Sequence, residues 1–167
     1  MRKKYCACEK KAESLGILFI LCFFSGLVLM PQRLVQAEVR QPTSPEGLWK
    51  TIDDHTGEPR GLVRIYREGG AYFGRLEANL VPSEADARCS ACKDERKDQP
   101  VVGMMILRGL KEAADGDGFD GGDVLDPESG SVYRCILRLE GEGRRLNVRG
   151  YVGLSLFGRS QTWLRAE

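Results

Sequence analysis

The stretch from Leu146 to Arg165 reads L-N-V-R-G-Y-V-G-L-S-L-F-G-R-S-Q-T-W-L-R. Apolar and polar residues alternate before Tyr151, which is typical of a strand with one buried face. The glycines that follow predict a corner, and a further strand is expected to end at Trp163 and Arg165. Because Gly47-Leu48-Trp49 stands at the front of the folded part, a tryptophan marks each end of the domain. This arrangement suggests a closed β structure.

The rest of the chain after residue 47 consists of short apolar or alternating segments separated by turn residues. Strands are expected at 48–52, 62–67, 71–78, 101–110, 122–125, 132–140, 145–152 and 161–165. The clearest is 132–140, where alternation places Cys135 on the inner face. An all-β fold follows: a small antiparallel up-and-down barrel of about eight strands, with a sandwich as the alternative.

The first 37 residues have the pattern of a signal peptide rather than of the folded domain. A basic start precedes an apolar run from Leu15 to Met30, and Val35-Gln36-Ala37 offers small residues for a signal peptidase. The sequence therefore predicts a signal helix in 1–37 cleaved after Ala37, a disordered lead-in at 38–46, and a single barrel domain at 47–167. A periplasmic or secreted location is expected, with no stable membrane span after cleavage; an uncleaved anchor is the alternative.

Charge and cysteine content change once this segment is removed. The first 37 residues hold six of the 25 Lys and Arg residues and two of the 24 Asp and Glu residues, so the remainder has a net charge of −3. Its charges are interspersed, which argues against binding nucleic acid. Of six cysteines, only Cys89, Cys92 and Cys135 remain, in an oxidising compartment.

The motif Cys89-Ser90-Ala91-Cys92 carries the clearest chemistry in the chain. A structural disulfide is the favoured interpretation, and a redox pair or half of a zinc site are the alternatives. A zinc site would need two more ligands, and only His55 and the inward-facing Cys135 are available. Asp53, Asp54 and His55 are interpreted as turn residues rather than as an acid and base. We expect no cofactor and no metal.

Several longer motifs together give a more specific signal. They are G-L-W-K-T-I-D-D-H-T-G at 47–57, C-S-A-C at 89–92, G-M-M-I-L-R-G-L at 103–110, G-G-D-V-L-D-P-E-S-G-S-V-Y at 121–133, and R-G-Y-V-G-L-S-L-F-G-R-S-Q-T-W-L-R at 149–165. On these residues the chain resembles a bacterial family of secreted envelope proteins known as domain of unknown function 2147. The resemblance implies a calycin-like barrel in the periplasm or outside the cell, without an established activity.

A second resemblance is to lipocalins, whose first strand carries Gly-x-Trp and whose last strand region supplies an arginine that packs over that tryptophan. Gly47-Leu48-Trp49 matches the first part, and Arg165 or Arg159 could supply the second.

We therefore expect a non-enzymatic barrel that binds a small, partly apolar ligand or an envelope protein. The alternative is a thiol-redox or metal-handling protein that uses Cys89 and Cys92. The expected cavity or mouth residues are Trp49, Met104, Ile106, Tyr133, Arg149, Tyr151, Arg159, Trp163 and Arg165. For the arginines near Tyr151 and Trp163, a cation against an aromatic face is favoured over an anion site.

Overall fold

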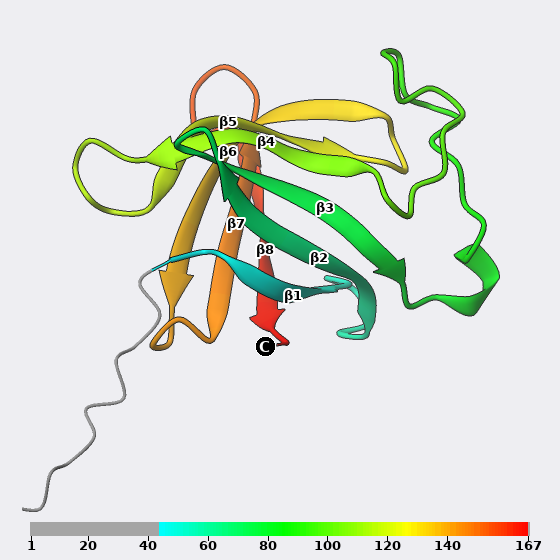
Figure 1. Ribbon diagram of the computed structural model, residues 1–167, viewed down its shortest axis with the longest axis horizontal. Coiled ribbons are helices and arrows are strands. Elements are labelled where there is room, and N and C mark those ends of the chain that lie inside the picture. Colours follow the sequence, from blue (N-terminus) through cyan, green and yellow to red (C-terminus); the bar gives the residue numbers. More distant parts are fainter. Residues whose placement is uncertain (1–43, 167) are drawn as a thin grey trace, which may run out of the picture. The chain divides into compact units, whose positions relative to one another are not determined.

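A computed structural model describes residues 44–166 of the chain, which form a closed antiparallel barrel (Figure 1). The strands are β1 (Gly47–Ile52), β2 (Pro59–Glu68), β3 (Ala71–Asn79), β4 (Met105–Glu112), β5 (Phe119–Asp126), β6 (Ser131–Glu140), β7 (Arg145–Tyr151) and β8 (Gly158–Arg165). Each strand pairs with the next in sequence, and β8 returns to β1. The expected up-and-down barrel of about eight strands is confirmed.

Four strands begin three or four residues from the expected position. β2 begins at Pro59 rather than at residue 62, and β8 begins at Gly158 rather than at residue 161. β4 begins at Met105 rather than at residue 101, because the preceding residues turn: the N–H of Met104 donates to the carbonyl of Val101, and the N–H of Val101 to that of Ala87. β5 runs from 119 to 126 rather than from 122 to 125, since pairing with β4 and β6 holds its Asp-Gly residues in the sheet. Tertiary pairing overrides a poor local strand preference here.

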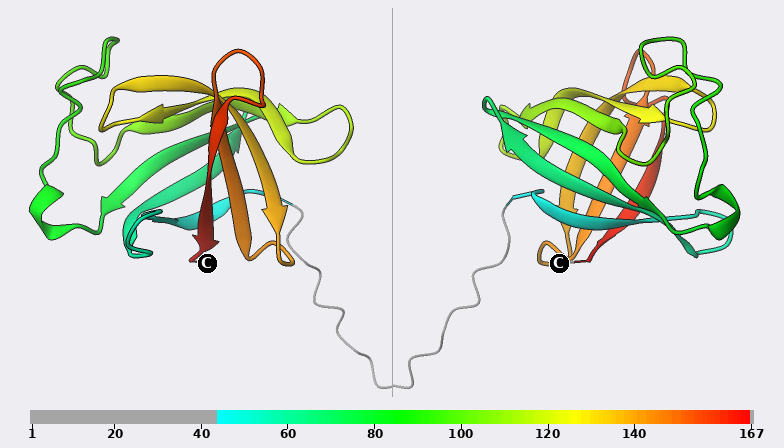
Figure 2. Two further views of the ribbon diagram at one scale, coloured as in Figure 1. Left: turned by 180° about the vertical axis from the view of Figure 1, so that it is seen from behind. Right: turned by 45° about the vertical axis from the view of Figure 1, so that its right-hand side comes forward.

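The two ends of the barrel are built differently (Figure 2). The C-terminus and the β6–β7 turn lie at one end, and the β7–β8 loop lies at the other. All eight strands belong to one compact unit, Val39–Glu167. The signal segment lies outside the described residues. Within 44–166, no helix is long and apolar enough to cross a membrane.

Side chains fill the interior at the C-terminal end. The buried residues of this core include Trp49, Val63, Ile65, Tyr72, Leu107, Leu110, Phe119, Cys135, Leu137, Leu146 and Trp163. Tyr72 and Phe119 meet edge to face with centroids 4.9 Å apart. Gly74 makes room for Leu107, because a Cβ on this glycine would lie only 2.8 Å from the leucine Cδ1. Packing of this density leaves space for a ligand only toward the other end.

Arg165 closes the filled end of the barrel. Its guanidinium carbon lies 4.2 Å from the centroid of the Trp49 ring. The same group donates to the carbonyl oxygens of Glu46 (2.7 Å), Ser44 (3.0 Å) and Gly143 (2.7 Å). The indole N–H of Trp49 in turn donates to the carbonyl of the buried Pro45, at 2.8 Å. One side chain thus joins the start of β1, the β6–β7 turn and the end of β8.

The seam between β1 and β8 is short. These strands are in register only at Trp49 opposite Arg165 and at Lys50 opposite Leu164, whereas β7 and β8 pair along seven residues. Toward the other end of the barrel, β1 and β8 continue without ladder pairing. The side chain of Arg159 crosses this gap to the carboxylate of Asp54.

We predict that Arg165→Met destabilises the protein by about 2–4 kcal/mol, because three carbonyls lose a charged donor and Trp49 loses a stacked cation. Arg165→Lys should recover only part of the lost stability, because its ammonium group keeps the charge but cannot reach all three carbonyls. Chemical denaturation of the 39–167 unit measures both. Arg144→Met, at an arginine that is 74% exposed in the adjacent turn, is the control and should change stability by less than about 0.5 kcal/mol. Equal losses for Arg165→Met and Arg144→Met would contradict the role given to Arg165.

Candidate functional site

A cavity of about 770 Å³ opens at the end of the barrel opposite Arg165. It lies between the four loops of that end and the upper halves of the strands. Its lining includes Thr51, Leu76, Ile106, Val124, Leu125, Tyr133, Val148, Tyr151, Gln161 and Trp163 from the strands, and Ala87, Arg88, Ser90 and Val101 from the β3–β4 loop. Single-ligand sites in proteins usually measure about 300 to 1,000 Å³. The cavity is therefore large enough for one ligand.

The deep part of the cavity is apolar. Trp163, Val148 and Ile106 line it and are themselves nearly buried, as parts of the core that fills the lower barrel. The indole N–H of Trp163 has a partner there, because the side-chain oxygen of Gln161 accepts it at 3.3 Å. An apolar part of a ligand is best placed here, because burial of its surface needs no hydrogen-bond partner.

The rim of the cavity is charged, and Arg60 is at its centre. Its guanidinium lies 3.3 Å from Asp53, 2.8 Å from Glu84 and 2.6 Å from Glu128, residues of three different loops. Burial alone would lower the pKa of Arg60, but the hydrogen bond to Asp53 and the charges of Glu128 and Glu84 outweigh it and raise the pKa. Arg60 thus remains cationic and holds the β1–β2, β3–β4 and β5–β6 loops together.

Asp53 shapes the β1–β2 turn rather than serving as a base. One of its carboxylate oxygens accepts the backbone N–H groups of His55 and Thr56, each at 2.9 Å. These two bonds, with the Thr56 N–H as the larger cause, lower the pKa of Asp53 well below its usual range. A carboxylate with so low a proton affinity is a poor general base. The interpretation of residues 53–55 as turn residues agrees with this geometry.

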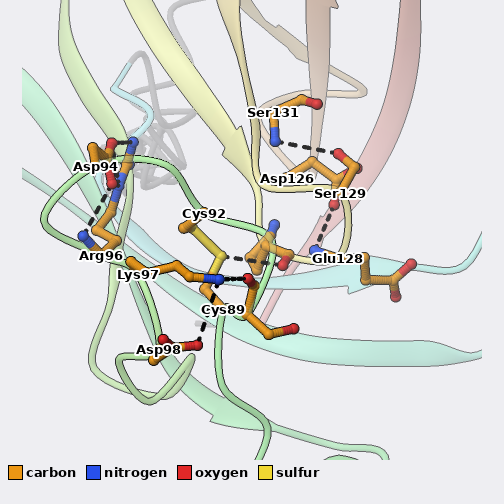
Figure 3. Close-up of a disulfide and its surroundings, with 12 residues drawn as sticks. Cys89, Cys92, Asp94, Arg96, Lys97, Asp98, Asp126, Glu128, Ser129 and Ser131 are labelled. Atoms are coloured by element: carbon orange, nitrogen blue, oxygen red, sulfur yellow. Dashed lines mark hydrogen bonds and ion pairs between the residues drawn. A yellow bond between two sulfur atoms is a disulfide. The ribbon is translucent and has the colours of Figure 1, made fainter.

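The β3–β4 loop carries Cys89 and Cys92 (Figure 3) and contributes residues to the lining of the cavity. Cys89 and Cys92 form a disulfide and are both buried. The sulfur of Cys89, which carries no proton, lies 3.2 Å from the carbonyl oxygen of Pro127 in the β5–β6 turn. Gly130 completes this contact, because a Cβ there would lie 2.1 Å from the carbonyl oxygen of Ala91. The disulfide therefore seats the loop against the neighbouring turn.

Beyond the disulfide, an ordered arginine supports the same loop. Arg96 is 7% exposed, and its Nε donates to Asp94 at 3.0 Å while its Nη1 donates to the carbonyl of Met105 at 3.2 Å. The hydrogen bonds from Arg96 lower the pKa of Asp94 to about 2. Within 44–166, no group of three or more His, Cys, Asp or Glu residues is placed to hold a metal ion.

The structure divides the expected site residues between the two ends of the barrel. Ile106, Tyr133, Tyr151, Arg159 and Trp163 line the cavity. Trp49 and Arg165 lie at the filled end, and Met104 is buried beside the β3–β4 loop without lining the cavity. Arg149 holds the β7–β8 loop through the carbonyls of Ser155 and Leu156. The alternative of an anion site at the mouth stays a prediction, and Arg165 lies too far from the mouth to belong to it.

Several lining residues were not expected from the sequence. Arg60, Glu84 and Glu128 meet only because three loops converge, and no spacing in the chain indicates this. Leu76, Val124 and Val148 are inward residues of alternating strands. Strand alternation could have suggested that they face the interior, but not that they lie above the filled part of the core.

Sequential pairing of eight strands, a Trp–Arg closure at one end and a cavity at the other define a lipocalin-like barrel. A solved structure supports this class: protein HP1028 from the human pathogen Helicobacter pylori, described as belonging to the lipocalin family, matches with a TM-score of 0.64. The match covers 74% of this chain and 84% of that one, at 14% sequence identity.

The sequence places the chain in a family more directly. Residues 47–165 match the family described as "Uncharacterized protein conserved in bacteria (DUF2147)", and the chain belongs to it. The resemblance to that family and to lipocalins is confirmed. No curated protein matches the chain.

We predict that Cys135 and the disulfide are chemically inert in the folded protein. Burial raises the pKa of the Cys135 thiol to about 12, so the reactive thiolate is scarce up to about pH 10. N-ethylmaleimide should therefore leave Cys135 unlabelled in native protein and label it rapidly in urea. Cys89 and Cys92 should be labelled only after unfolding and reduction. Rapid native labelling at pH 8, mapped by peptide mass spectrometry, would contradict this.

Proposed function

We propose that this protein is a non-enzymatic carrier that binds one small, partly apolar molecule in the cavity of its barrel, outside the cytoplasm. The observation that carries the proposal is the cavity of about 770 Å³ with an apolar depth and a charged rim. Such a division suits a molecule with an apolar body and a polar end. The lipocalin-like fold and the buried disulfide are consistent with binding and with an extracytoplasmic location.

The thiol-redox or metal-handling alternative has little support. Cys89 is fully buried and Cys92 is 2% exposed, so a thiol-exchange partner has no access to either sulfur. Cys135, in strand β6, is the one free cysteine among residues 44–166 and is buried.

The rim suggests which polar ends are accepted. Five carboxylates line the cavity, from Asp53, Asp54, Glu84, Asp126 and Glu128, against three guanidinium groups. Arg60 and Arg159 are already bound to carboxylates of the rim. A ligand carboxylate would therefore meet a surplus of negative charge, whereas a hydroxyl or an amine would not. We propose an uncharged or cationic polar end.

Filling the cavity should abolish binding. Val124 lines the cavity, and Val132, on the adjacent strand, is 47% exposed on the outside. We expect Val124→Trp to weaken binding of the uncharged fluorophore N-phenyl-1-naphthylamine at least tenfold by occupying its space, and Val132→Trp to leave the affinity within about twofold. Titration followed by probe fluorescence measures both. Equal affinities in the two variants would place the ligand elsewhere.

Charge selectivity is tested with dodecanol, dodecylamine and dodecanoate as competitors of that fluorophore at pH 7. We expect dodecanoate to bind about three- to tenfold more weakly than dodecanol, because its carboxylate meets the acidic rim. The double variant Glu84→Gln/Glu128→Gln and 1 M salt should each narrow the difference. Tighter binding of dodecanoate than of the other two would refute the proposed polar end, while leaving the cavity itself as the site.

A further inference from the structure

The β7–β8 loop exposes an unusual number of large apolar side chains. Val152, Leu154, Leu156 and Phe157 are 66%, 67%, 80% and 73% exposed, and residues 152–158 contain no charged side chain. Single exposed apolar residues are ordinary on protein surfaces, but a group of four within six residues marks a site of interaction.

The loop is held in shape while these side chains face solvent. The guanidinium of Arg149 donates to the carbonyl of Ser155 from Nε (2.9 Å) and Nη2 (2.7 Å), and to that of Leu156 at 3.3 Å. The N–H of Phe157 donates to the carbonyl of Leu154 at 3.0 Å, and its own carbonyl accepts the N–H of Val152. The carbonyls of residues 154–157 thus have partners, either within the loop or from Arg149 of β7. The tip can enter an apolar medium without leaving these carbonyls unpaired.

The loop stands at the mouth of the cavity. Val152 and Phe157 line the cavity, while Leu154 and Leu156 lie outside it at the tip. Figure 2 shows the loop projecting beyond the ends of the strands. The apolar surface is therefore continuous from the tip into the opening.

We propose that the apolar tip of the β7–β8 loop, residues 152–157, inserts shallowly into the interface of a lipid bilayer and turns the cavity mouth toward the lipid. A bilayer fits better than a protein partner, because the tip projects, residues 152–158 contain no charged side chain, and the carbonyls of residues 154–157 already have hydrogen-bond donors. The acidic rim beside it excludes a contact driven by anionic headgroups. Burial of apolar side chains drives the insertion. Leu154 and Leu156 do not line the cavity, so the insertion of their side chains does not depend on ligand binding.

Flotation of the 39–167 unit with phosphatidylcholine vesicles tests the insertion. We expect the wild type to float with the vesicles. The double variant Leu154→Ser/Leu156→Ser should lower the partition coefficient between vesicles and buffer by about tenfold or more. Leu164→Ser, at an apolar residue 41% exposed on β8 away from the tip, is the matched control and should bind within about twofold of wild type. Binding should persist in 1 M salt and should not increase with phosphatidylglycerol.

A second measurement places the contact at the tip. In Leu156→Trp the new indole should shift its emission to the blue on adding vesicles and be quenched by brominated lipid, while Trp49 and Trp163 stay buried in the barrel. Absence of wild-type flotation, equal flotation of the double serine variant, or dependence on anionic lipid would each overturn the proposal. Concentration-dependent self-association that the double variant abolishes, without flotation, would assign the tip to a protein contact instead. As a control for folding, the double serine variant should still bind N-phenyl-1-naphthylamine, which shows that its cavity is intact.

Discussion

The barrel depends on the contact between Arg165 and Trp49. A closed sheet must join its first strand to its last, and here the two strands pair at only two positions. The guanidinium of Arg165 compensates by stacking on Trp49 and by binding carbonyls from residues 44, 46 and 143. Burial lowers the pKa of Arg165, yet the group stays charged at any physiological pH, so this closure does not titrate.

Closure at one end determines where function can lie. The large side chains gather around Trp49 and fill the lower barrel, so open volume remains only beneath the four loops of the other end. Two sets of contacts hold those loops together. Arg60 joins three of them through carboxylates, and the disulfide places the β3–β4 loop against the β5–β6 turn. The cavity thus results from the uneven filling of the barrel by side chains and from the contacts between the loops, rather than from a motif in the chain.

Alternation and turn residues were sufficient to predict the barrel and most of its strands. They failed at the starts of β2, β4, β5 and β8, where pairing with neighbouring strands and a loop contact decide the structure. For the cation that packs over Trp49, the sequence left Arg159 and Arg165 as candidates, and the structure shows that it is Arg165. The rim could not be predicted, because Arg60, Glu84 and Glu128 are far apart in sequence and meet through loop geometry. The exposure of the β7–β8 tip was not predicted either, because leucines in a sequence are equally consistent with a place in the core.

The short seam between β1 and β8 makes one side of the barrel wall weaker than the rest. Above Lys50 and Leu164 the two strands are joined across the gap by the ion pair of Arg159 with Asp54, both partly exposed to water. Exposed ion pairs contribute little to stability. The β1–β8 junction thus has fewer paired positions than any other strand pair of the barrel. Since Asp54 and Arg159 also line the cavity, the least supported part of the wall lies next to the mouth.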